Sequence, residues 1–307
     1  MKAVRIHGYG GPEVLKYEEA PVPEPGVDDI LVRIHSAAVN PVDWKIRNGI
    51  SKAFPIDFPF ILGWDLAGTV VEAGKMVRGF KAGDKVFARP DTMRNGAYAE
   101  YIAMRACEAT FAPTSIPPEQ AAGVPLAAQT AWVGLFEAGR LKPGQKVLIH
   151  GGSGAVGIFA VQLAAIAGAQ VTATTSEKNI DLVRSLGASQ VINYQGEDFT
   201  KKVKDLDLVL DTIGGETQKK SWDLIRGGGS LVSTVGVDAG EAQRRGIRGI
   251  GFMLQAHGAR LAEIGKLIDE GRLKVIIERE FPLSETRKAQ ELSAQGHARG
   301  KIIIRIE

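Results

Sequence analysis

The chain has 307 residues, which at roughly 150 residues per domain is enough for two domains. Its 38 basic and 35 acidic residues leave a formal charge of only +3, so neither a nucleic acid nor a membrane surface is expected as a partner. Hydrophobic residues make up 44% of the chain, which excludes a disordered protein, and the single Cys107 excludes an intramolecular disulfide and a multi-cysteine metal cluster.

The first third of the chain is rich in short strands. β-Branched and aromatic residues between glycine, proline and aspartate predict strands at residues 2–7, 30–38, 68–73, 85–88 and 97–103. Pro21, Pro23 and Pro25 predict a loop, because proline cannot sit inside a central strand. This part of the chain is therefore predicted to form a β-rich domain.

After Pro117 and Pro118 the pattern changes. Residues 119–139 are predicted to be helical with a break at Pro125, and helices and strands then alternate. The helices are predicted at residues 156–167 and 177–186, and the strands at 146–150, 171–174, 191–193, 207–211 and 230–235. Short apolar strands separated by helices are typical of a parallel sheet that is covered on both faces.

The C-terminal part returns to a mixed pattern. A helix is predicted at residues 259–270, where four apolar residues recur at helical spacing, and strands are predicted at 274–278 and 301–306. The last strand would be free to rejoin the N-terminal β-rich domain. The two most apolar stretches, 121–139 and 155–169, are interrupted by polar residues or fall short of the roughly 20 residues that cross a membrane. The N-terminus lacks the apolar segment of a signal peptide, so a cytoplasmic protein is expected.

A glycine-rich loop joins the predicted strand at 146–150 to the following helix. Its glycines at 152, 154 and 157 give the pattern G-x-G-x-x-G. The first permits a tight turn, the second lets a pyrophosphate approach the backbone, and the third lets the helix pack closely on the strand. The N–H groups at the start of the helix attract phosphate. We therefore predict a dinucleotide site made by Gly152, Ser153, Gly154, Ala155, Val156 and Gly157.

The end of the next strand indicates which dinucleotide binds. An NAD site carries Asp or Glu there for the ribose 2′-hydroxyl, whereas this strand ends in Thr174, Thr175 and Ser176. Lys178 follows, and small hydroxyls with a cation suit a 2′-phosphate. Glu177 does not fit this pattern unless it faces solvent, and Lys178 on a solvated helix face is the alternative. The sequence thus favours NADP(H), held by Thr175, Ser176 and Lys178.

Several segments resemble the medium-chain dehydrogenase/reductase superfamily, and most closely its zinc-independent quinone oxidoreductase branch. They are residues 40–45, 63–68, 96–101, 125–131, 150–157, 186–194 and 300–303, in the family's order along the whole chain. The resemblance implies a GroES-like domain formed by residues 1–117 and 258–307, and a Rossmann domain, a doubly wound parallel sheet, at 118–257. It places the active site in the cleft between them.

The same resemblance shows at which positions of this sequence zinc ligands would be expected. Zinc-binding relatives carry Gly-His-Glu where this chain has Gly63, Trp64 and Asp65, and they also carry a four-cysteine lobe. Here only one cysteine is present, and the five histidines lack ligand spacing. No metal site is therefore predicted. Members without zinc reduce quinones or polarised C=C bonds with NADPH, in which the nicotinamide supplies the hydride and the protein supplies position and electrostatics.

The resemblance also nominates site residues outside the glycine loop. Asn40 would hydrogen-bond a quinone carbonyl and Asp43 would anchor a water or cation, while the alternative is that they cap a turn and start a helix. Trp64 would form a wall for a planar substrate or fill the core. Thr130 would contact the nicotinamide end of the cofactor, and Tyr194 would flank its adenosine. Val235 and Gly236 end a strand where cofactors bind, and His297, Arg299 and Lys301 would add charge near the 2′-phosphate.

The predicted function is hydride transfer from NADPH to a quinone or a similar α,β-unsaturated carbonyl. A reductase for alkenals or enones is the alternative within this chemistry. A nucleotide-binding protein with little turnover, serving a structural or RNA-binding role, is the alternative from another class, although the low net charge argues against nucleic acid. The resemblance further implies a homodimer that pairs through the sheet edge near residues 246–251.

Overall fold

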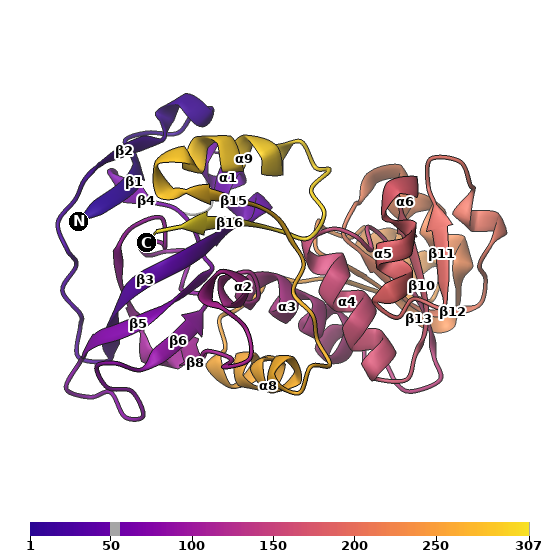
Figure 1. The fold of residues 1–307 in the computed structure, drawn as a ribbon. Coiled ribbons are helices and arrows are strands. Elements are labelled where there is room, and N and C mark those ends of the chain that lie inside the picture. The colour runs from indigo at the N-terminus through magenta and orange to yellow at the C-terminus, as the bar shows by residue number, and fades with distance from the viewer. Residues whose placement is uncertain (50–55, 307) are drawn as a thin grey trace. The chain divides into compact units, whose positions relative to one another are not determined.

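The structure, a computed structural model, describes residues 1–49 and 56–306, and the chain divides into two compact units (Figure 1). The β-rich unit contains Met1–Leu126 and Gln255–Glu307, and the α/β unit contains Ala127–Leu254. The β-rich unit is therefore built from both ends of the chain. Within the described residues, no helix is long and apolar enough to cross a membrane.

The main sheet of the β-rich unit has the strand order β15-β16-β3-β5-β6-β8, and β7 also pairs with β3. The C-terminal strand β16 pairs antiparallel with β3, with Ile302 opposite Val39, as the sequence predicted for the last strand. The strands are β3 (Asp29–Val39), β5 (Leu66–Ala73), β6 (Lys85–Ala88), β7 (Tyr101–Arg105), β8 (Ala109–Phe111), β15 (Ile277–Pro282) and β16 (Lys301–Arg305).

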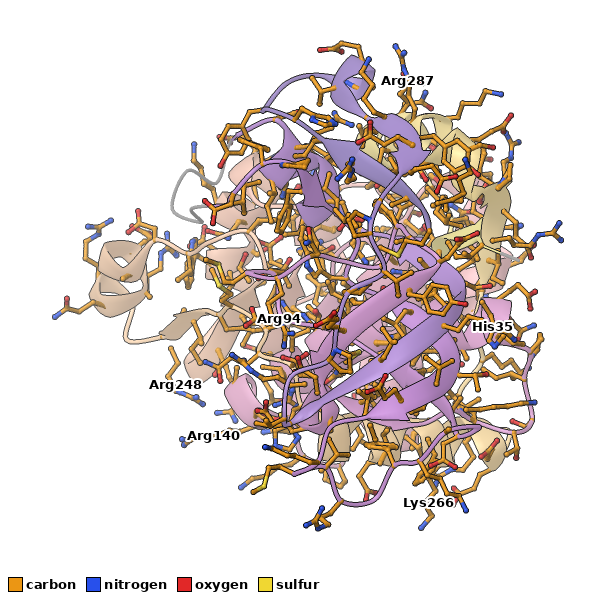
Figure 2. The ribbon with its side chains drawn as sticks, turned by 90° about the vertical axis from the view of Figure 1, so that its left-hand side faces the viewer. His35, Arg94, Arg140, Arg248, Lys266 and Arg287 are labelled. Carbon is orange, nitrogen blue, oxygen red and sulfur yellow. The ribbon has the colours of Figure 1, made fainter. Side chains whose placement is uncertain are left out.

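A three-stranded sheet and, among the described residues, four α-helices complete this unit. The smaller sheet contains β1 (Lys2–Ile6), β2 (Lys16–Glu19) and β4 (Phe60–Ile61), and the helices are α1 (Pro41–Arg47), α2 (Pro118–Ala122), α8 (Gly258–Asp269) and α9 (Thr286–Ala294). Helix α9 packs against β15 and β16, and α8 packs against β8 (Figure 1). Lys266 on α8 and Arg287 on α9 point outward, so each helix keeps a polar face in solvent (Figure 2).

The α/β unit contains a six-stranded parallel sheet of order β11-β10-β9-β12-β13-β14. Its strands are β9 (Lys146–Ile149), β10 (Gln170–Thr175), β11 (Gln190–Asn193), β12 (Leu206–Asp211), β13 (Ile225–Ser233) and β14 (Arg248–Gly251). Numbered from β9, this is the order 3-2-1-4-5-6 of a Rossmann sheet, which confirms the predicted fold class. The helices are α3 (Pro125–Trp132), α4 (Ala155–Ile166), α5 (Ile180–Ser185), α6 (Gly215–Ser221) and α7 (Ala239–Arg244).

Some predicted boundaries were wrong. The strand expected at residues 274–278 lies at Ile277–Pro282, because the partner strand β16 aligns Phe281 with Ile304 and buries both side chains. The strand expected at 97–103 begins only at Tyr101, since the N–H groups of Ala97 and Tyr98 bond instead to the carbonyls of Gly63 and Leu62. Helix α9 was not predicted at all.

Candidate active site

The glycine-rich loop lies between β9 and α4. A Cβ on Gly157 would stand 2.0 Å from the carbonyl oxygen of Gly151, and a Cβ on Gly152 would stand 2.9 Å from the Cβ of Ala173. Packing within the unit therefore requires glycine at both positions. A Cβ on Gly154 would meet only one atom within 4 Å, at 3.3 Å. Glycine at this position thus keeps space open at the start of α4.

The start of α4 has the groups that a pyrophosphate needs. Gly154 is the N-cap residue of α4 and, because glycine has no side chain, the helix receives no side-chain capping hydrogen bond there. The N–H groups of the first helical turn have no partner within the helix, and they carry the positive end of its dipole. These residues fit the diphosphate of a dinucleotide, which supports the interpretation of the loop at 152–157.

The end of β10 contacts the loop through three side chains. Thr175 is 1% exposed, and its hydroxyl donates to Ser153 Oγ over 2.8 Å. Asn179, which the sequence analysis missed, donates from Nδ2 to the hydroxyls of Ser153 at 3.1 Å and Ser176 at 3.2 Å. Lys178 is exposed and makes no hydrogen bond or ion pair with the residues that the structure describes. Thr175 therefore supports the loop, while Ser176 and Lys178 remain available to a ligand.

The other predicted cofactor residues lie after neighbouring strands. Tyr194 follows β11, is 52% exposed and donates its backbone N–H to the carbonyl of Thr175. Val235 follows β13 and is 46% exposed, and Gly236 has a φ of +101°. Because the carboxyl ends of parallel strands meet at one edge of the sheet, these residues share an edge with the glycine loop. Thr130 is buried in α3, and its contact with the nicotinamide end stays a prediction.

Two buried residues hold this edge in place. Asp211 accepts hydrogen bonds from the N–H groups of Ile213 and Gly214 and from the side chains of Gln218 and Ser233. It thereby fixes the loop after β12 against the end of β13. The signal for it in the sequence is a carboxylate at the end of an apolar strand.

His150, at the end of β9, is also buried in the α/β unit. Its Nε2 lies 2.8 Å from Ser221 Oγ, whose hydroxyl donates to the carbonyl of Thr217, so His150 Nε2 carries the proton. Nδ1 lies 3.1 Å from Thr174 Oγ1 and accepts from it. Burial lowers the pKa of His150 to about 4. His150 is therefore a neutral structural histidine at pH 7.

Four polar side chains form a row across four neighbouring strands of the β-rich unit. We call Lys301, Asn40, Asp65 and Arg89 the polar row. Lys301 is the first residue of β16, and Asn40, Asp65 and Arg89 stand directly next to the ends of β3, β5 and β6, beyond the pairs Ile302–Val39 and Leu66–Ala88. The backbone N–H of Ala38 bonds to the carbonyl of Asp65, which joins the two pairs.

Three members of the polar row are bonded to one another. Lys301 Nζ donates to Asn40 Oδ1 at 2.6 Å and to Asp65 Oδ2 at 3.0 Å, and Asn40 Nδ2 donates to Asp65 Oδ2 at 2.8 Å. The other carboxylate oxygen of Asp65 accepts from the N–H of Leu126 at 2.6 Å. None of the three is more than 1% exposed. Burial raises the pKa of Asp65, and the ammonium of Lys301 opposes that rise.

These contacts correct one expectation and restrict another. Lys301 was expected near a 2′-phosphate, but its ammonium is buried in the β-rich unit and bonded there, since a charge in the interior needs a partner. Asn40 was expected to bind a quinone carbonyl. Its Oδ1 accepts from Lys301 and one N–H of its Nδ2 donates to Asp65, so only the second N–H of Nδ2 could bind a carbonyl, and that role stays a prediction.

Asp43 lies in the first turn of α1 and is wholly buried. Its Oδ2 accepts from the backbone N–H of Asn40 at 2.8 Å and from the hydroxyl of Tyr98 at 2.5 Å, whereas its Oδ1 has no hydrogen-bond partner in the described part of the chain. Burial raises the pKa of Asp43 to about 7. These contacts fit the capping alternative. A role in anchoring water or a cation stays a prediction.

Trp64 is also 0% exposed and packs in the hydrophobic core of the β-rich unit. The structure thus fits the core-filling alternative, and no face of this ring is open to a planar substrate. The polar residues around it are poor zinc ligands, because Asp65 already has the ammonium of Lys301 as its cation. Over the described residues, no group of three or more histidine, cysteine and acidic side chains is arranged to hold a metal.

A GroES-like unit completed by the C-terminal strand, together with a Rossmann unit, defines a medium-chain dehydrogenase/reductase. The family profile for an alcohol dehydrogenase GroES-like domain matches residues 26–117, and the profile for a zinc-binding dehydrogenase matches residues 186–304.

Relatives narrow this class. The chain is 34% identical to an NADPH-dependent alkenal/one oxidoreductase of Arabidopsis thaliana, over 99% of this chain and 79% of that protein. It superposes on the quinone oxidoreductase of Coxiella burnetii with a TM-score of 0.94 and 35% identity, over 100% and 99% of the two chains. The Escherichia coli quinone oxidoreductase complexed with NADPH gives a TM-score of 0.91 and 28% identity, over the full length of both chains. The chain belongs to the quinone oxidoreductase branch of the superfamily.

Proposed function

We propose that this protein transfers a hydride from NADPH to a quinone or to a similar α,β-unsaturated carbonyl compound. The observation that carries the proposal is the nucleotide cradle, in which glycine at 154 leaves the start of α4 open, and the exposed Lys178, which has no ion pair among the described residues, follows the neighbouring strand β10. The names of the relatives, a quinone oxidoreductase and an alkenal/one oxidoreductase, support both substrate types.

In this proposal the two units have separate tasks. The α/β unit binds NADPH through residues 152–157, Ser176 and Lys178, with Tyr194 beside the adenosine and Val235 and Gly236 toward the nicotinamide. Bound NADPH supplies the hydride, and the protein orients it. The β-rich unit binds the substrate. Following the sequence expectation, we propose boundaries near residues 117 and 257 for these functional domains, and a cytoplasmic location.

The test is the rate of NADPH oxidation with 1,4-naphthoquinone, a 2-alkenal and a cyclic enone, each against a blank without enzyme. Saturable turnover of at least one class supports the proposal. Tight NADPH binding without turnover of any of them would instead favour the nucleotide-binding alternative.

We also propose that the reaction proceeds without zinc. The purified protein should hold less than one zinc per ten chains by elemental analysis, and incubation with a chelator should leave NADPH oxidation unchanged. The reason is that the position of the zinc-binding histidine is held by Trp64, and Asp65 is already neutralised by Lys301. Zinc in a one-to-one ratio, lost together with activity, would contradict this.

Lys178→Ala should weaken NADPH binding about tenfold to a hundredfold, because one charge-assisted hydrogen bond to the 2′-phosphate is lost. NADH, which lacks this phosphate, should bind as before. The exposed charge of Lys178 is screened by ions, so the difference should shrink in high salt. Fluorescence titration with both nucleotides gives the dissociation constants.

Two further variants sharpen this measurement. Lys204→Ala removes an equally exposed lysine of the same unit and should change neither constant. The carboxylate in Ser176→Asp should repel the 2′-phosphate of NADPH and accept hydrogen bonds from the ribose hydroxyls of NADH. The preference for NADPH over NADH should therefore become smaller. Because Thr175 is buried against Ser153, Ser176 is the better position for this carboxylate. Equal weakening of NADPH and NADH by Lys178→Ala would show that the lysine does not read the phosphate.

We further propose a homodimer that pairs through β14. This strand ends the six-stranded sheet, and Met253 just beyond it is 72% exposed. Arg248 on β14 is seen at the periphery of Figure 2. Light scattering at micromolar concentration should give twice the mass of the chain, and Ile250→Lys should give the monomer with unchanged NADPH affinity. A monomeric wild type would refute the proposal.

A further inference from the structure

Arg89, the fourth member of the polar row, differs from the other three because its hydrogen-bond donors are unused. The residue is only 8% exposed, and its Nε is completely enclosed with no hydrogen-bond partner. Its two Nη nitrogens are not completely enclosed, and they too have no partner among the residues that the structure describes. The guanidinium is thus held inside the β-rich unit with its outer N–H groups reaching an accessible position.

The carboxylates near Arg89 do not account for it. Asp65, Asp91 and Glu108 are close enough to affect its charge, but none forms an ion pair with it within 4 Å. Each carboxylate is paired with a cation other than Arg89. Lys301 lies 3.0 Å from Asp65, and Arg105 lies 3.3 Å from Asp91 and 3.8 Å from Glu108. Burial lowers the pKa of Arg89, because its surroundings disfavour the charged form of the guanidinium.

Burying a guanidinium without hydrogen bonds raises the free energy of the folded protein, so the position of Arg89 indicates a ligand whose hydrogen bonds offset that free energy. Within the polar row, Lys301, Asn40 and Asp65 are hydrogen-bonded to one another, whereas Arg89 donates no hydrogen bond to the residues that the structure describes. Its planar N–H groups suit a carbonyl oxygen or an oxyanion.

We infer that Arg89 is the residue of the β-rich unit that binds the carbonyl oxygen of the substrate and stabilises the negative charge that develops on it. This inference rests on the proposed function. When a hydride from NADPH adds to the β-carbon of an enone, the π pair of the C=C bond forms a new double bond between the α-carbon and the carbonyl carbon. The π pair of the C=O bond moves onto the oxygen, which becomes an enolate oxyanion, while the nucleotide leaves as NADP⁺. Water then supplies the proton at the α-carbon. Arg89 donates hydrogen bonds throughout and keeps its own protons.

The experiment compares Arg89→Met and Arg89→Lys with wild type and with Arg279→Met. Arg279 is an exposed arginine on β15 of the same unit and serves as the matched control. The probe is 2-hydroxy-1,4-naphthoquinone, which carries an oxyanion at neutral pH and whose visible absorbance reports binding. Its dissociation constant should rise about tenfold to a hundredfold in Arg89→Met, by less in Arg89→Lys, and not in Arg279→Met.

Two more readouts separate this role from a structural one. The kcat/KM for 1,4-naphthoquinone should fall in parallel with probe affinity, while the dissociation constant of NADPH stays within twofold of wild type. The Tm of Arg89→Met should equal or exceed that of wild type, because an unpaired buried charge is removed and its apolar stem is kept. A lower Tm or a failure to fold would mean that Arg89 has structural partners, and would overturn the inference.

Unchanged probe affinity in Arg89→Met would also overturn it. If wild type oxidises NADPH with quinones and Arg89→Met does so equally well, the inference fails and the proposed function stands. If wild type turns over no carbonyl substrate, the proposed function fails, and probe binding alone still decides whether Arg89 holds an oxyanion.

Discussion

Gly157→Ala is expected to abolish measurable NADPH binding and to lower the stability of the α/β unit. The new Cβ would lie 2.0 Å from the carbonyl oxygen of Gly151 and 2.8 Å from the carbonyl carbon of Gly152. These are backbone atoms, so no side chain can rotate to relieve the clash, and the start of α4 has to move away from β9. A displacement of about 1 Å at a binding site costs on the order of a hundredfold. Fluorescence titration and thermal unfolding measure the two effects.

Two other glycines of the same unit provide controls for this variant. A Cβ on Gly154 meets one atom at 3.3 Å, so Gly154→Ala should keep the Tm and still lose NADPH affinity, since the methyl group enters the space left for the pyrophosphate. A Cβ on Gly227 meets nothing within 4 Å, so Gly227→Ala should change neither quantity. Wild-type NADPH affinity in Gly154→Ala would show that the diphosphate does not pass this residue.

Lys301→Met is expected to destabilise the β-rich unit by about 3–5 kcal/mol, because it leaves the buried carboxylate of Asp65 without its cation. It also removes the donor that bonds Asn40 Oδ1. Urea unfolding followed by circular dichroism gives the change in free energy. Lys301→Met/Asp65→Asn should recover most of the loss, since the charge is then removed with its partner and an asparagine can keep hydrogen bonds to Asn40 and to the N–H of Leu126.

The loss in Lys301→Met should also depend on pH. Without Lys301, burial holds the pKa of Asp65 further above its value in the unfolded chain, which is about 3.9. The folded state then binds a proton that the unfolded state releases, so stability falls as the pH rises between the two pKa values. The destabilisation measured at pH 8 should therefore exceed that at pH 5. An equal loss at both values would show that Asp65 is not the group left uncompensated.

The nucleotide cradle could be predicted because its parts are adjacent in sequence. Strand β9, the glycine loop and α4 follow one another between residues 146 and 166. The structure gives Gly157 the close packing that the sequence predicted. At Gly152 it shows a contact with Ala173 instead, and the positive φ of the turn belongs to Gly151. That this sheet is parallel follows from the alternation of helices and strands, whereas its strand order is known only from the structure. The role of Thr175 was less predictable, since the sequence does not tell whether its hydroxyl faces a ligand or Ser153.

The residue pattern predicted a β-rich unit, an alternating α/β unit and its glycine loop, because backbone propensity and hydrophobic period act over short stretches of chain. The GroES-like architecture was expected from the family resemblance. Only the tertiary structure decided what Asn40, Asp65, Arg89 and Lys301 do. Asn40 is 25 residues from Asp65 and 261 from Lys301, and they meet because β16 returns to pair with β3. A buried polar atom needs a hydrogen-bond partner that is close in space. Whether a side chain is hydrogen-bonded within the protein or remains available to a substrate therefore depends on the pairing of strands that are distant in sequence.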